Sequence, residues 1–305
     1  MNDVVLLAGT ASRALAWRVA SELGVGVGAA EVERFPDGET SLVVDEEVEG
    51  RDVFVVQATS PPVNDHLIEL LAFADGCRRG GARRIVAVVP YFGYARSDRR
   101  DGGACPVMAS LAAGLIEAAG FDRVVVVDAH IAQIEGFFRA PVDPVSAVPT
   151  LAAALTGRVP EDAVVVAPDL GAAERAAALA ERLDLDFAVL QKRRRSGALV
   201  EIVHVFGDVR GRSCLIVDDM ISTGGTIAEA VRALRDAGAE GEMVVAATHG
   251  VLTTPARSRL AGLGLREIVL TDTIPVDAET WPMVRVVSVA PLLADAVRRI
   301  AGEGS

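Results

Sequence analysis

Short runs of β-branched and other apolar residues recur along the whole chain, and they are continuous rather than alternating with polar residues. The clearest runs are residues 53–57, 85–89, 124–127, 164–167, 214–217, 243–247 and 268–270. Continuous apolar runs of this length are typical of strands that are covered on both faces, as in parallel sheets. The chain is therefore predicted to build its core on parallel strands.

Stretches with helical periodicity lie between these runs. Apolar residues recur at helical spacing in three of them: Leu67, Leu70, Leu71 and Ala74; Leu111, Leu115 and Ala118; Ile227, Val231 and Leu234. Alternation of strands and helices predicts doubly wound α/β sheets. In such sheets ligands bind beyond the carboxyl ends of the strands, so polar clusters at those positions are the candidate functional residues.

The length of 305 residues allows two domains, and residues 140–149 ("APVDPVSAVP"), with three prolines and no helical period, mark the expected boundary. We predict an N-terminal α/β domain over residues 1–143 and a C-terminal α/β domain over residues 144–305.

The net charge of −12 argues against a nucleic-acid-binding protein, because affinity for a phosphate backbone depends on a basic surface. No apolar segment has the length of a membrane span, and the N-terminus lacks a signal-peptide pattern. Three scattered cysteines without metal-type spacing indicate reduced thiols. We expect a cytoplasmic protein that binds neither nucleic acid nor membranes.

The stretch "VDDMISTGGT", residues 217–226, follows an apolar run and combines two adjacent acids with a turn of small residues. Thr226 and Glu229 have capping-box spacing, which predicts a helix over residues 227–237. Backbone N–H groups and hydroxyls of residues 222–226 would then point past a helix N-terminus, an arrangement that binds phosphate. The alternative is an ordinary strand-to-helix turn; the adjacent acids favour a functional role.

Three other clusters follow predicted strands. The cations of residues 192–195 ("KRRR") could clamp a polyphosphate from a flap tip, or could form a solvated basic loop. Residues 91–100 contain both tyrosines of the protein and three arginines, which suit a nucleotide base and its phosphates, or a structural ion pair. His130 and Asp169 each end a strand and could hold a divalent ion, although a lone histidine is more often structural.

Taken together, these segments resemble the ribose-phosphate pyrophosphokinase (phosphoribosyl-pyrophosphate synthetase) family over nearly the full chain. The matching segments are residues 34–39, 90–96, 133–138, 192–194, 206–209 and 218–226. The resemblance implies two tandem domains of type I phosphoribosyltransferase-like fold, Mg²⁺ as cofactor, and homo-oligomers from dimer to hexamer. It also implies transfer of the β,γ-pyrophosphoryl group of ATP to the 1-hydroxyl of ribose 5-phosphate, with release of AMP.

The resemblance assigns roles to particular residues. Lys192 and Arg194 would stabilise the transition state. The ATP site would comprise Phe35, Asp37, Glu39, Arg96 and Asp98, with the loop of the first three contributed by a neighbouring subunit. Ribose 5-phosphate would be bound by Asp218, Asp219, Ser222, Thr223, Gly224, Gly225 and Thr226. His130 and Asp169 match the metal positions.

Some positions depart from the family pattern. Ser222 stands where an aspartate is usual in the phosphate turn, and Ser97 where a glutamine is usual on the ATP side. Two other classes of function compete with an active synthetase. A catalytically silent paralogue would bind and regulate an active synthetase, but the flap cations and metal positions are retained. A phosphoribosyltransferase shares the phosphate turn but needs neither a tandem domain nor the loop of residues 91–98.

Overall fold

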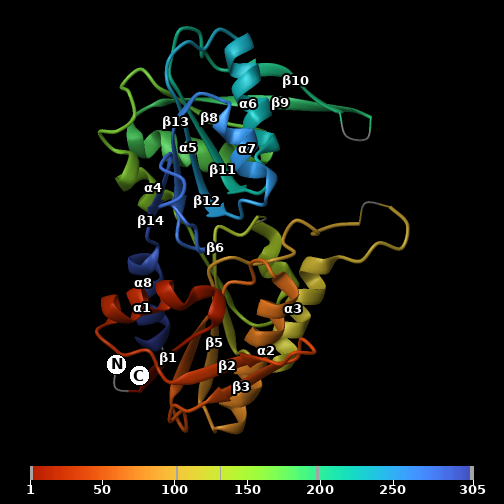
Figure 1. Ribbon diagram of the computed structural model, residues 1–305, viewed down its shortest axis with the longest axis vertical. Helices are drawn as coiled ribbons and strands as arrows, with labels where there is room; N and C mark the ends of the chain where they lie inside the picture. Colours follow the sequence, from red (N-terminus) through yellow and green to blue (C-terminus); the bar gives the residue numbers. More distant parts are fainter. Residues whose placement is uncertain (1–2, 101, 131, 197–198, 303–305) are drawn as a thin grey trace. The chain divides into compact units, whose positions relative to one another are not determined.

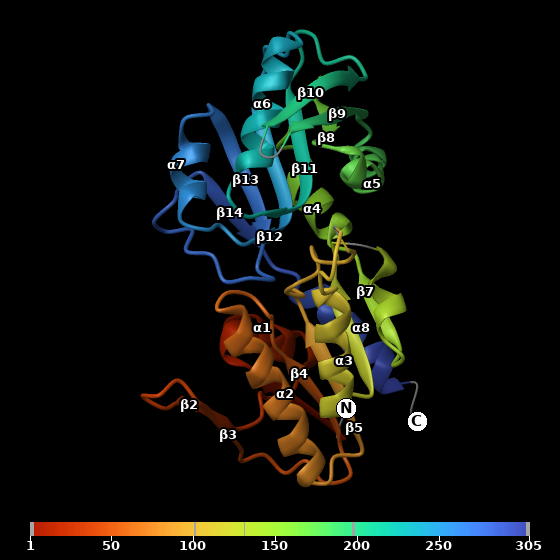
Figure 2. The same ribbon diagram turned by 90° about the vertical axis from the view of Figure 1, so that its right-hand side faces the viewer.

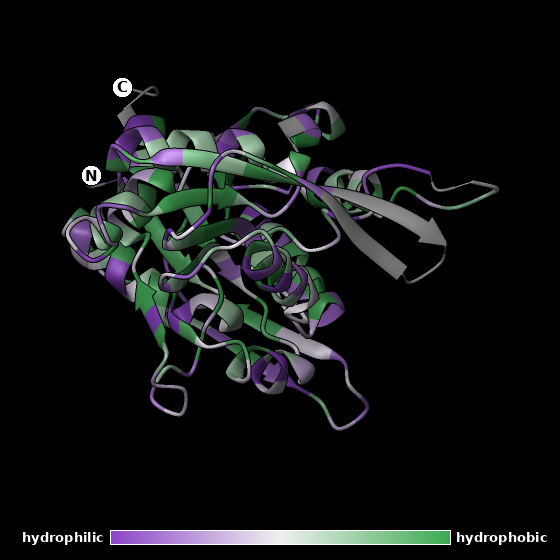
Figure 3. Cartoon of the chain, turned by 90° about the horizontal axis from the view of Figure 1, so that it is seen from above, coloured by the Kyte–Doolittle hydropathy of each residue, from purple (hydrophilic) through white to green (hydrophobic). Residues whose placement is uncertain are grey.

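A computed structural model describes residues 3–100, 102–130, 132–196 and 199–302, and the chain divides into two compact units. Unit 1 comprises Met1–Ser146, Thr273–Pro275 and Ser288–Ser305; unit 2 comprises Ala147–Asp272 and Val276–Val287. Both units are built on mainly parallel sheets, as the apolar runs predict. Hydrophobic residues gather on the strands, and hydrophilic residues occur mostly on helices and loops (Figure 3).

Unit 1 contains a parallel sheet with strand order β1-β4-β5-β6-β7. The strands are β1 (Val4–Ala8), β4 (Asp52–Val56), β5 (Arg84–Val89), β6 (Arg123–Val127) and β7 (Val142–Val145). The helices are α1 (Arg13–Leu23), α2 (Val63–Arg79), α3 (Met108–Ala119) and α8 (Ala290–Gly302), with short 3-10 helices at η1 (Thr10–Ser12) and η2 (Ala132–Phe137). Helices α1 and α8 pack together on one face of the sheet, and α2 and α3 pack together on the other (Figure 1).

A second, two-stranded sheet extends from unit 1. Its strands β2 (Ala30–Arg34) and β3 (Thr40–Val44) are antiparallel and are joined by residues 35–39. The hairpin contacts α2 through β3, and its turn projects away from the five-stranded sheet (Figure 2). The turn residues are therefore displayed at the end of an extended arm.

Unit 2 contains a seven-stranded sheet with strand order β10-β9-β8-β11-β12-β13-β14, parallel except for the β9/β10 pair. The strands are β8 (Val164–Ala167), β9 (Asp186–Ser196), β10 (Leu199–Phe206), β11 (Cys214–Ile221), β12 (Met243–Gly250), β13 (Leu265–Thr271) and β14 (Val284–Val287). Helices α4 (Val148–Leu155) and α5 (Ala173–Leu183) cover one face, and α6 (Gly225–Asp236) and α7 (Pro255–Ala261) cover the other; η3 (Leu170–Ala172) precedes α5. The doubly wound prediction is confirmed in both units.

The predicted apolar faces are confirmed for α6, where Ile227, Val231 and Leu234 are buried, but not for α3. Leu111 and Leu115 of α3 are 51% and 40% exposed. This helix buries its small face instead, through Ala109, Ala112, Ala113 and Ile116. Helix α3 has apolar residues on more than one face, so periodicity alone does not identify the face that packs on α2 and the sheet.

The observed units differ from the predicted division in the C-terminal segment. The first boundary, after residue 146, lies close to the expected one after residue 143, but residues 288–305 belong to unit 1. Within unit 1, Arg84 Nη2 donates to Ile300 O of α8 at 2.9 Å. Arg299 of α8 pairs with Asp143 at 3.3 Å. Contacts between segments so distant in sequence leave no local signal in the chain.

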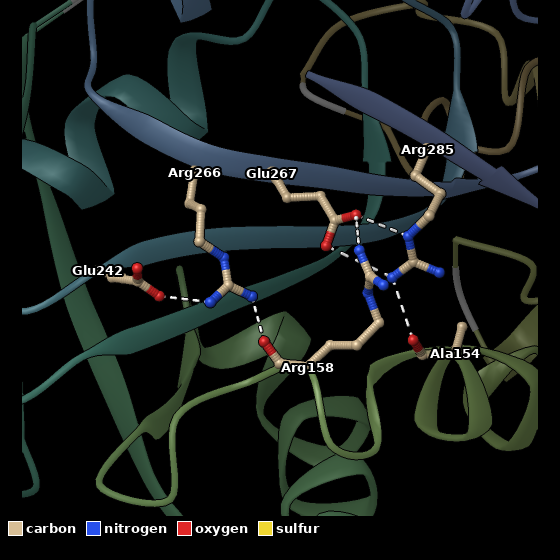
Figure 4. Close-up of polar contacts among 6 residues, drawn as sticks. All are labelled: Ala154, Arg158, Glu242, Arg266, Glu267 and Arg285. Atoms are coloured by element: carbon tan, nitrogen blue, oxygen red, sulfur yellow. Dashed lines mark hydrogen bonds and ion pairs between the residues drawn. The ribbon is translucent and has the colours of Figure 1, made fainter. Parts of the chain in front are cut away.

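Side chains at the amino-terminal part of β13 and β14 form a polar cluster within unit 2 (Figure 4). Glu267 accepts from Arg285 Nε at 2.6 Å and pairs with Arg158 Nη2 at 3.2 Å. Arg285 also donates to Ala154 O at the end of α4. Burial alone would raise the pKa of Glu267, but the hydrogen bonds and charges of the two arginines outweigh burial and hold this pKa below its usual value.

None of the helices in the described residues is long and apolar enough to cross a membrane. All three cysteines are free thiols, and burial raises the pKa of Cys77 and of Cys214 to about 11.

Candidate active site

The phosphate turn, residues 222–226, lies between the end of β11 and the first residues of α6. Gly224 has φ +74° and ψ 5°, a left-handed conformation, and the helix begins at Gly225. No side chain caps it, so the capping box predicted for Thr226 is wrong. The left-handed glycine turns the chain sharply enough for the helix to begin two residues earlier than expected, which places Thr226 inside the first turn.

The first helical residues direct their N–H groups out of the end of α6. Ala228 N donates to Gly224 O at 3.0 Å and closes the first helical turn. The N–H groups of Gly225, Thr226 and Ile227 precede that bond and have no carbonyl one turn back to bond to. Such donors, together with the positive end of the helix dipole, are an arrangement that favours the binding of an anion.

Asp218 and Asp219 lie in the last part of β11, directly before this turn. Asp219 is 5% exposed, and its N–H donates to Asp218 Oδ1 at 2.9 Å. Burial raises the pKa of Asp218 well above its usual value, and the neighbouring charge of Asp219 adds to the increase. Asp219 is buried and Asp218 half-buried; two adjacent carboxylates in such a place are unfavourable by themselves and would be stabilised by hydroxyl donors or by a cation.

Asp169 approaches the same pair from β8, which is parallel to β11 and hydrogen-bonded to it. It follows β8, and its carboxylate accepts from Ala172 N at 3.3 Å at the start of η3. Its charge also contributes to the raised pKa of Asp218. Three acids thus gather at the carboxyl ends of two neighbouring strands of unit 2.

The sequence predicted that the cations of residues 192–195 lie at the tip of a flap. In the structure their backbone belongs to strand β9. β9 continues to Ser196 and pairs with β10, with Lys192 opposite Ile202 and Arg194 opposite Val200. The hairpin extends beyond the edge of the sheet of unit 2 (Figure 1). The side chains of Lys192 and Arg194 lie outside the described part of the chain.

In unit 1, Phe35, Asp37 and Glu39 lie in the exposed turn of the β2–β3 hairpin. Phe35 N donates to Glu39 O at 2.8 Å, and Glu39 N donates to Asp37 Oδ1 at 3.1 Å. These bonds close the turn around Gly38. Phe35 is 47% exposed, which leaves part of its side chain accessible to a ligand.

Arg96 and Asp98 follow β5 in a loop of unit 1, with Arg96 exposed and Asp98 half-buried. The sequence suggested that the two tyrosines of this loop present their aromatic faces to a nucleotide base, but in the structure neither tyrosine is fully exposed. Tyr91 is buried, and Tyr94, held at φ +67°, donates its hydroxyl to Asn64 Oδ1. A left-handed conformation at a bulky residue is strained and occurs most often at functional loops.

His130, the other residue expected to bind metal, is exposed and follows β6 in unit 1. Asp128, two residues earlier, has φ +36°. His130 and Asp169 therefore belong to different units. Within the part of the chain that the structure describes, no group of three or more His, Cys, Asp or Glu side chains could hold a metal ion.

Two further residues contact the phosphate turn from the segment after β12, and neither was among the residues predicted from the sequence. Thr253 N donates to Ser222 O at 3.0 Å, and Arg259 Nη1 donates to Thr223 O at 2.8 Å. Neither residue lies in a cluster or a recognisable motif.

Comparisons with known proteins agree with this arrangement. Residues 4–120 match the family model for the N-terminal domain of ribose phosphate pyrophosphokinase, and residues 200–305 match the model for the phosphoribosyl synthetase-associated domain. A curated protein from Maricaulis maris, "Ribose-phosphate pyrophosphokinase", is 45% identical over 303 residues, which is 98% of this chain and 97% of the relative. A protein of the same name from Chromobacterium violaceum is 44% identical over 307 residues, 100% of this chain and 94% of the relative.

Among solved structures, the crystal structure of phosphoribosylpyrophosphate synthetase from Mycobacterium smegmatis matches with a TM-score of 0.91 and 42% identity, covering 99% of both chains. The two parallel sheets, with an acid pair and a phosphate turn at the carboxyl edge of one, are of the type I phosphoribosyltransferase-like class. Within that class, the chain belongs to the ribose-phosphate pyrophosphokinase family.

Proposed function

We propose that this chain is an active ribose-phosphate pyrophosphokinase. It transfers the β,γ-pyrophosphoryl group of ATP to the 1-hydroxyl of ribose 5-phosphate, giving 5-phosphoribosyl 1-pyrophosphate and AMP for nucleotide biosynthesis. Membership of the family supports the reaction. The observation that carries the proposal is the succession of an adjacent acid pair, a left-handed glycine and the N-terminus of α6 at one edge of unit 2.

Ribose 5-phosphate matches that succession in its chemistry. The dianionic phosphate suits the N–H donors and small side chains of residues 222–226, which glycines allow it to approach closely. The ring hydroxyls suit the carboxylates of Asp218 and Asp219, which accept hydrogen bonds and gain compensation for their mutual repulsion. The serine at 222, where the family usually has aspartate, keeps an N–H and a hydroxyl for the phosphate.

The ATP side of the reaction is assigned to unit 1. Phe35, Asp37 and Glu39 would hold the adenosine part from the turn of the β2–β3 hairpin, and Arg96 with Asp98 would contact the phosphates. The β2–β3 hairpin projects away from the five-stranded sheet of unit 1, which supports the prediction that its turn serves a neighbouring subunit. Exposed Ile68, Leu111 and Leu115 on α2 and α3 also support self-association, because apolar side chains on neighbouring helices favour burial against another protein surface.

Lys192 and Arg194 are proposed to stabilise the charge that develops on the transferring phosphoryl group. Phosphoryl transfer needs little covalent chemistry from the protein, so positioning and charge provide most of the rate enhancement. The 1-hydroxyl oxygen of the sugar attacks the β-phosphorus of ATP and its proton is released to water; the bond between the β-phosphorus and the oxygen that bridges to the α-phosphorus breaks, and AMP leaves with that oxygen.

Mg²⁺ is the proposed cofactor, and it would take few ligands from the protein, because no group of three or more His, Cys, Asp or Glu side chains in the described residues could hold a metal ion. Asp169 lies near the Asp218–Asp219 pair, and carboxylate oxygens are suitable ligands for this ion. Mg²⁺ typically takes few protein ligands and is held mainly by substrate phosphates. A single protein ligand in each unit, His130 in unit 1 and Asp169 in unit 2, agrees with that preference. When bound, it would neutralise the phosphate charges. A cytoplasmic location stays a prediction from the sequence.

One assay tests the proposal directly. The purified chain is incubated with ribose 5-phosphate, ATP and Mg²⁺, and AMP and the pyrophosphorylated sugar are quantified by chromatography; ribose without the phosphate is the control substrate. Production of AMP that depends on ribose 5-phosphate is expected. A silent paralogue or a phosphoribosyltransferase would give no such AMP, and that result would overturn the proposal.

A further inference from the structure

One segment of unit 2, residues 252–260, holds the phosphate turn from outside. Leu252 N donates to Ile221 O at 2.9 Å. Thr253 donates to Ser222 O twice, from its N–H at 3.0 Å and from its hydroxyl at 3.2 Å. Leu252 has φ +42°, a strained conformation for a leucine, and strain of this kind persists only where surrounding contacts enforce it.

The next two residues of the turn are contacted from α7, which lies in the same segment. Arg259 Nη1 donates to Thr223 O at 2.8 Å. The buried side chain of Leu260 lies against Gly224, so close that an added Cβ would be 3.0 Å from Leu260 Cγ. Residues 221–224 are thus each contacted in turn by the segment 252–260. Its contacts fix the position of the N–H donors beyond Gly224.

Arg259 also brings a positive charge to this place. Residues 217–226 contain two acids and no cation, so a phosphate dianion bound there has no side-chain charge of opposite sign within the turn itself. Arg259 is exposed, and its Nη1 lies 3.4 Å from the place of a Cβ on Gly225. A guanidinium has five N–H donors, and in the described part of the chain the one acceptor it contacts is Thr223 O.

We propose that Arg259 is a positioning residue for the phosphate turn and a determinant of affinity for the phosphorylated end of the sugar. It fixes the carbonyl of Thr223, so that the following N–H groups face the ligand, and its charge favours a bound dianion. Thr253 fixes the carbonyl of Ser222 in the same way. This inference rests on the proposed function, because it takes residues 222–226 to be the site of the 5-phosphate.

Arg257 provides a matched control, because it is an exposed arginine on the same short helix. Its side chain donates to Thr280 O and lies over the ring of Trp281 at 5.9 Å from the ring centroid. Arg257→Ala therefore removes the same charge and a comparable set of structural contacts from α7 without touching the phosphate turn.

The experiment compares Arg259→Ala, Arg259→Lys and Arg257→Ala with the wild-type chain. Binding of ribose 5-phosphate is measured by isothermal titration, with ribose as the unphosphorylated probe, and thermal unfolding checks that each variant folds. Steady-state kinetics give the KM for each substrate and kcat. We expect Arg259→Ala to weaken ribose 5-phosphate about 10- to 100-fold, the usual loss for a hydrogen bond to a charged group. The kcat should stay near wild type, because the lost interaction stabilises the bound sugar phosphate equally in the ground state and in the transition state. The KM for ATP should also stay near wild type, because Arg259 is not proposed to contact ATP.

Arg259→Lys should recover part of the affinity, and Arg257→Ala should leave it unchanged. The inference is overturned if Arg259→Ala binds ribose 5-phosphate as wild type does, or if Arg257→Ala weakens binding equally. It is also overturned if the KM for ATP rises in parallel, since a general disturbance of unit 2 would then explain the loss. A wild-type chain that binds no ribose 5-phosphate would instead overturn the proposed sugar site, and this inference with it.

Discussion

Replacing Gly224 by alanine tests whether the shape of the phosphate turn, rather than the stability of unit 2, determines the affinity for ribose 5-phosphate. Gly224 is the N-cap of α6 at φ +74°, a conformation that residues with a Cβ adopt only at a cost. The added methyl group would lie 3.0 Å from Cγ of Leu260, a side chain with no exposed surface. Two unfavourable effects therefore act on the same residue.

The magnitude follows from those two effects. A left-handed conformation costs an alanine roughly 1–2 kcal/mol more than a glycine, and crowding in a packed interior costs about another 1 kcal/mol. Part of this strain can be relieved if the backbone of Gly224 rotates toward negative φ, but that movement redirects the N–H groups of Gly225 and Thr226. Losing one such donor to a charged phosphate reduces affinity about ten-fold or more. We expect both a lower free energy of unfolding and a higher KM for ribose 5-phosphate.

Gly238, just beyond the other end of α6, is the matched control. It has φ +91°, and a Cβ there would lie 3.4 Å from Cγ of Arg210, a milder contact with a flexible side chain. Gly238→Ala should lower the free energy of unfolding by about 1–2 kcal/mol through the same conformational cost while leaving the KM for ribose 5-phosphate unchanged. Urea denaturation and steady-state kinetics on both variants provide the comparison. Equal effects on KM, or no effect of Gly224→Ala, would refute the reasoning.

Three further predictions concern the flap, the acid pair and the polar cluster of unit 2. Lys192→Ala and Arg194→Ala should each lower kcat by a few hundred-fold, about 3 kcal/mol of lost transition-state stabilisation, with an unchanged unfolding midpoint; near-normal turnover would contradict the role of the flap. Asp218→Asn and Asp219→Asn should raise the KM for ribose 5-phosphate more than the KM for ATP, and the reverse pattern would mean that the substrates are assigned to the wrong units. Glu267→Gln should lower the free energy of unfolding at pH 7 by about 1–3 kcal/mol. Because the folded-state pKa of Glu267 lies below the unfolded value of about 4.3, this stabilisation is present above that pH and is lost as pH falls through the folded pKa. Urea denaturation of both chains at pH 7 and at acidic pH measures it, and a difference that grows on acidification would contradict the role of the arginines.

The strands were predictable because their signal is local. A run such as residues 124–127 is apolar throughout, and the structure buries all four residues in β6. The carboxyl edge was predictable for the same reason, since polar residues such as Asp169 and residues 222–226 follow their strands closely in the chain. The phosphate turn could be located without any knowledge of which helix face packs where.

Other features depend on contacts between distant segments. Leu111 and Leu115 form as good an apolar stripe as the alanines that α3 buries, and only the sheet beneath decides between the two faces. The packing of α8 on unit 1 depends on partners such as Arg84, more than 200 residues earlier in the chain. Arg259 lies on a separate helix 36 residues after Thr223, at a spacing that no motif describes.

The site in unit 2 by itself defines a ligand, not a reaction. If its acids accept from sugar hydroxyls and its turn donates to a phosphate, as proposed, any enzyme that handles ribose 5-phosphate or its 1-pyrophosphate could use it. A transferase that displaces pyrophosphate needs no nucleotide site, whereas a pyrophosphokinase must bind ATP as well. The ATP site proposed for unit 1, with the exposed Phe35 on its projecting hairpin, would have no role in the first reaction and a direct one in the second. We therefore expect unit 1 to distinguish the two activities, and substitutions there should affect the binding of ATP while leaving the binding of the sugar phosphate intact.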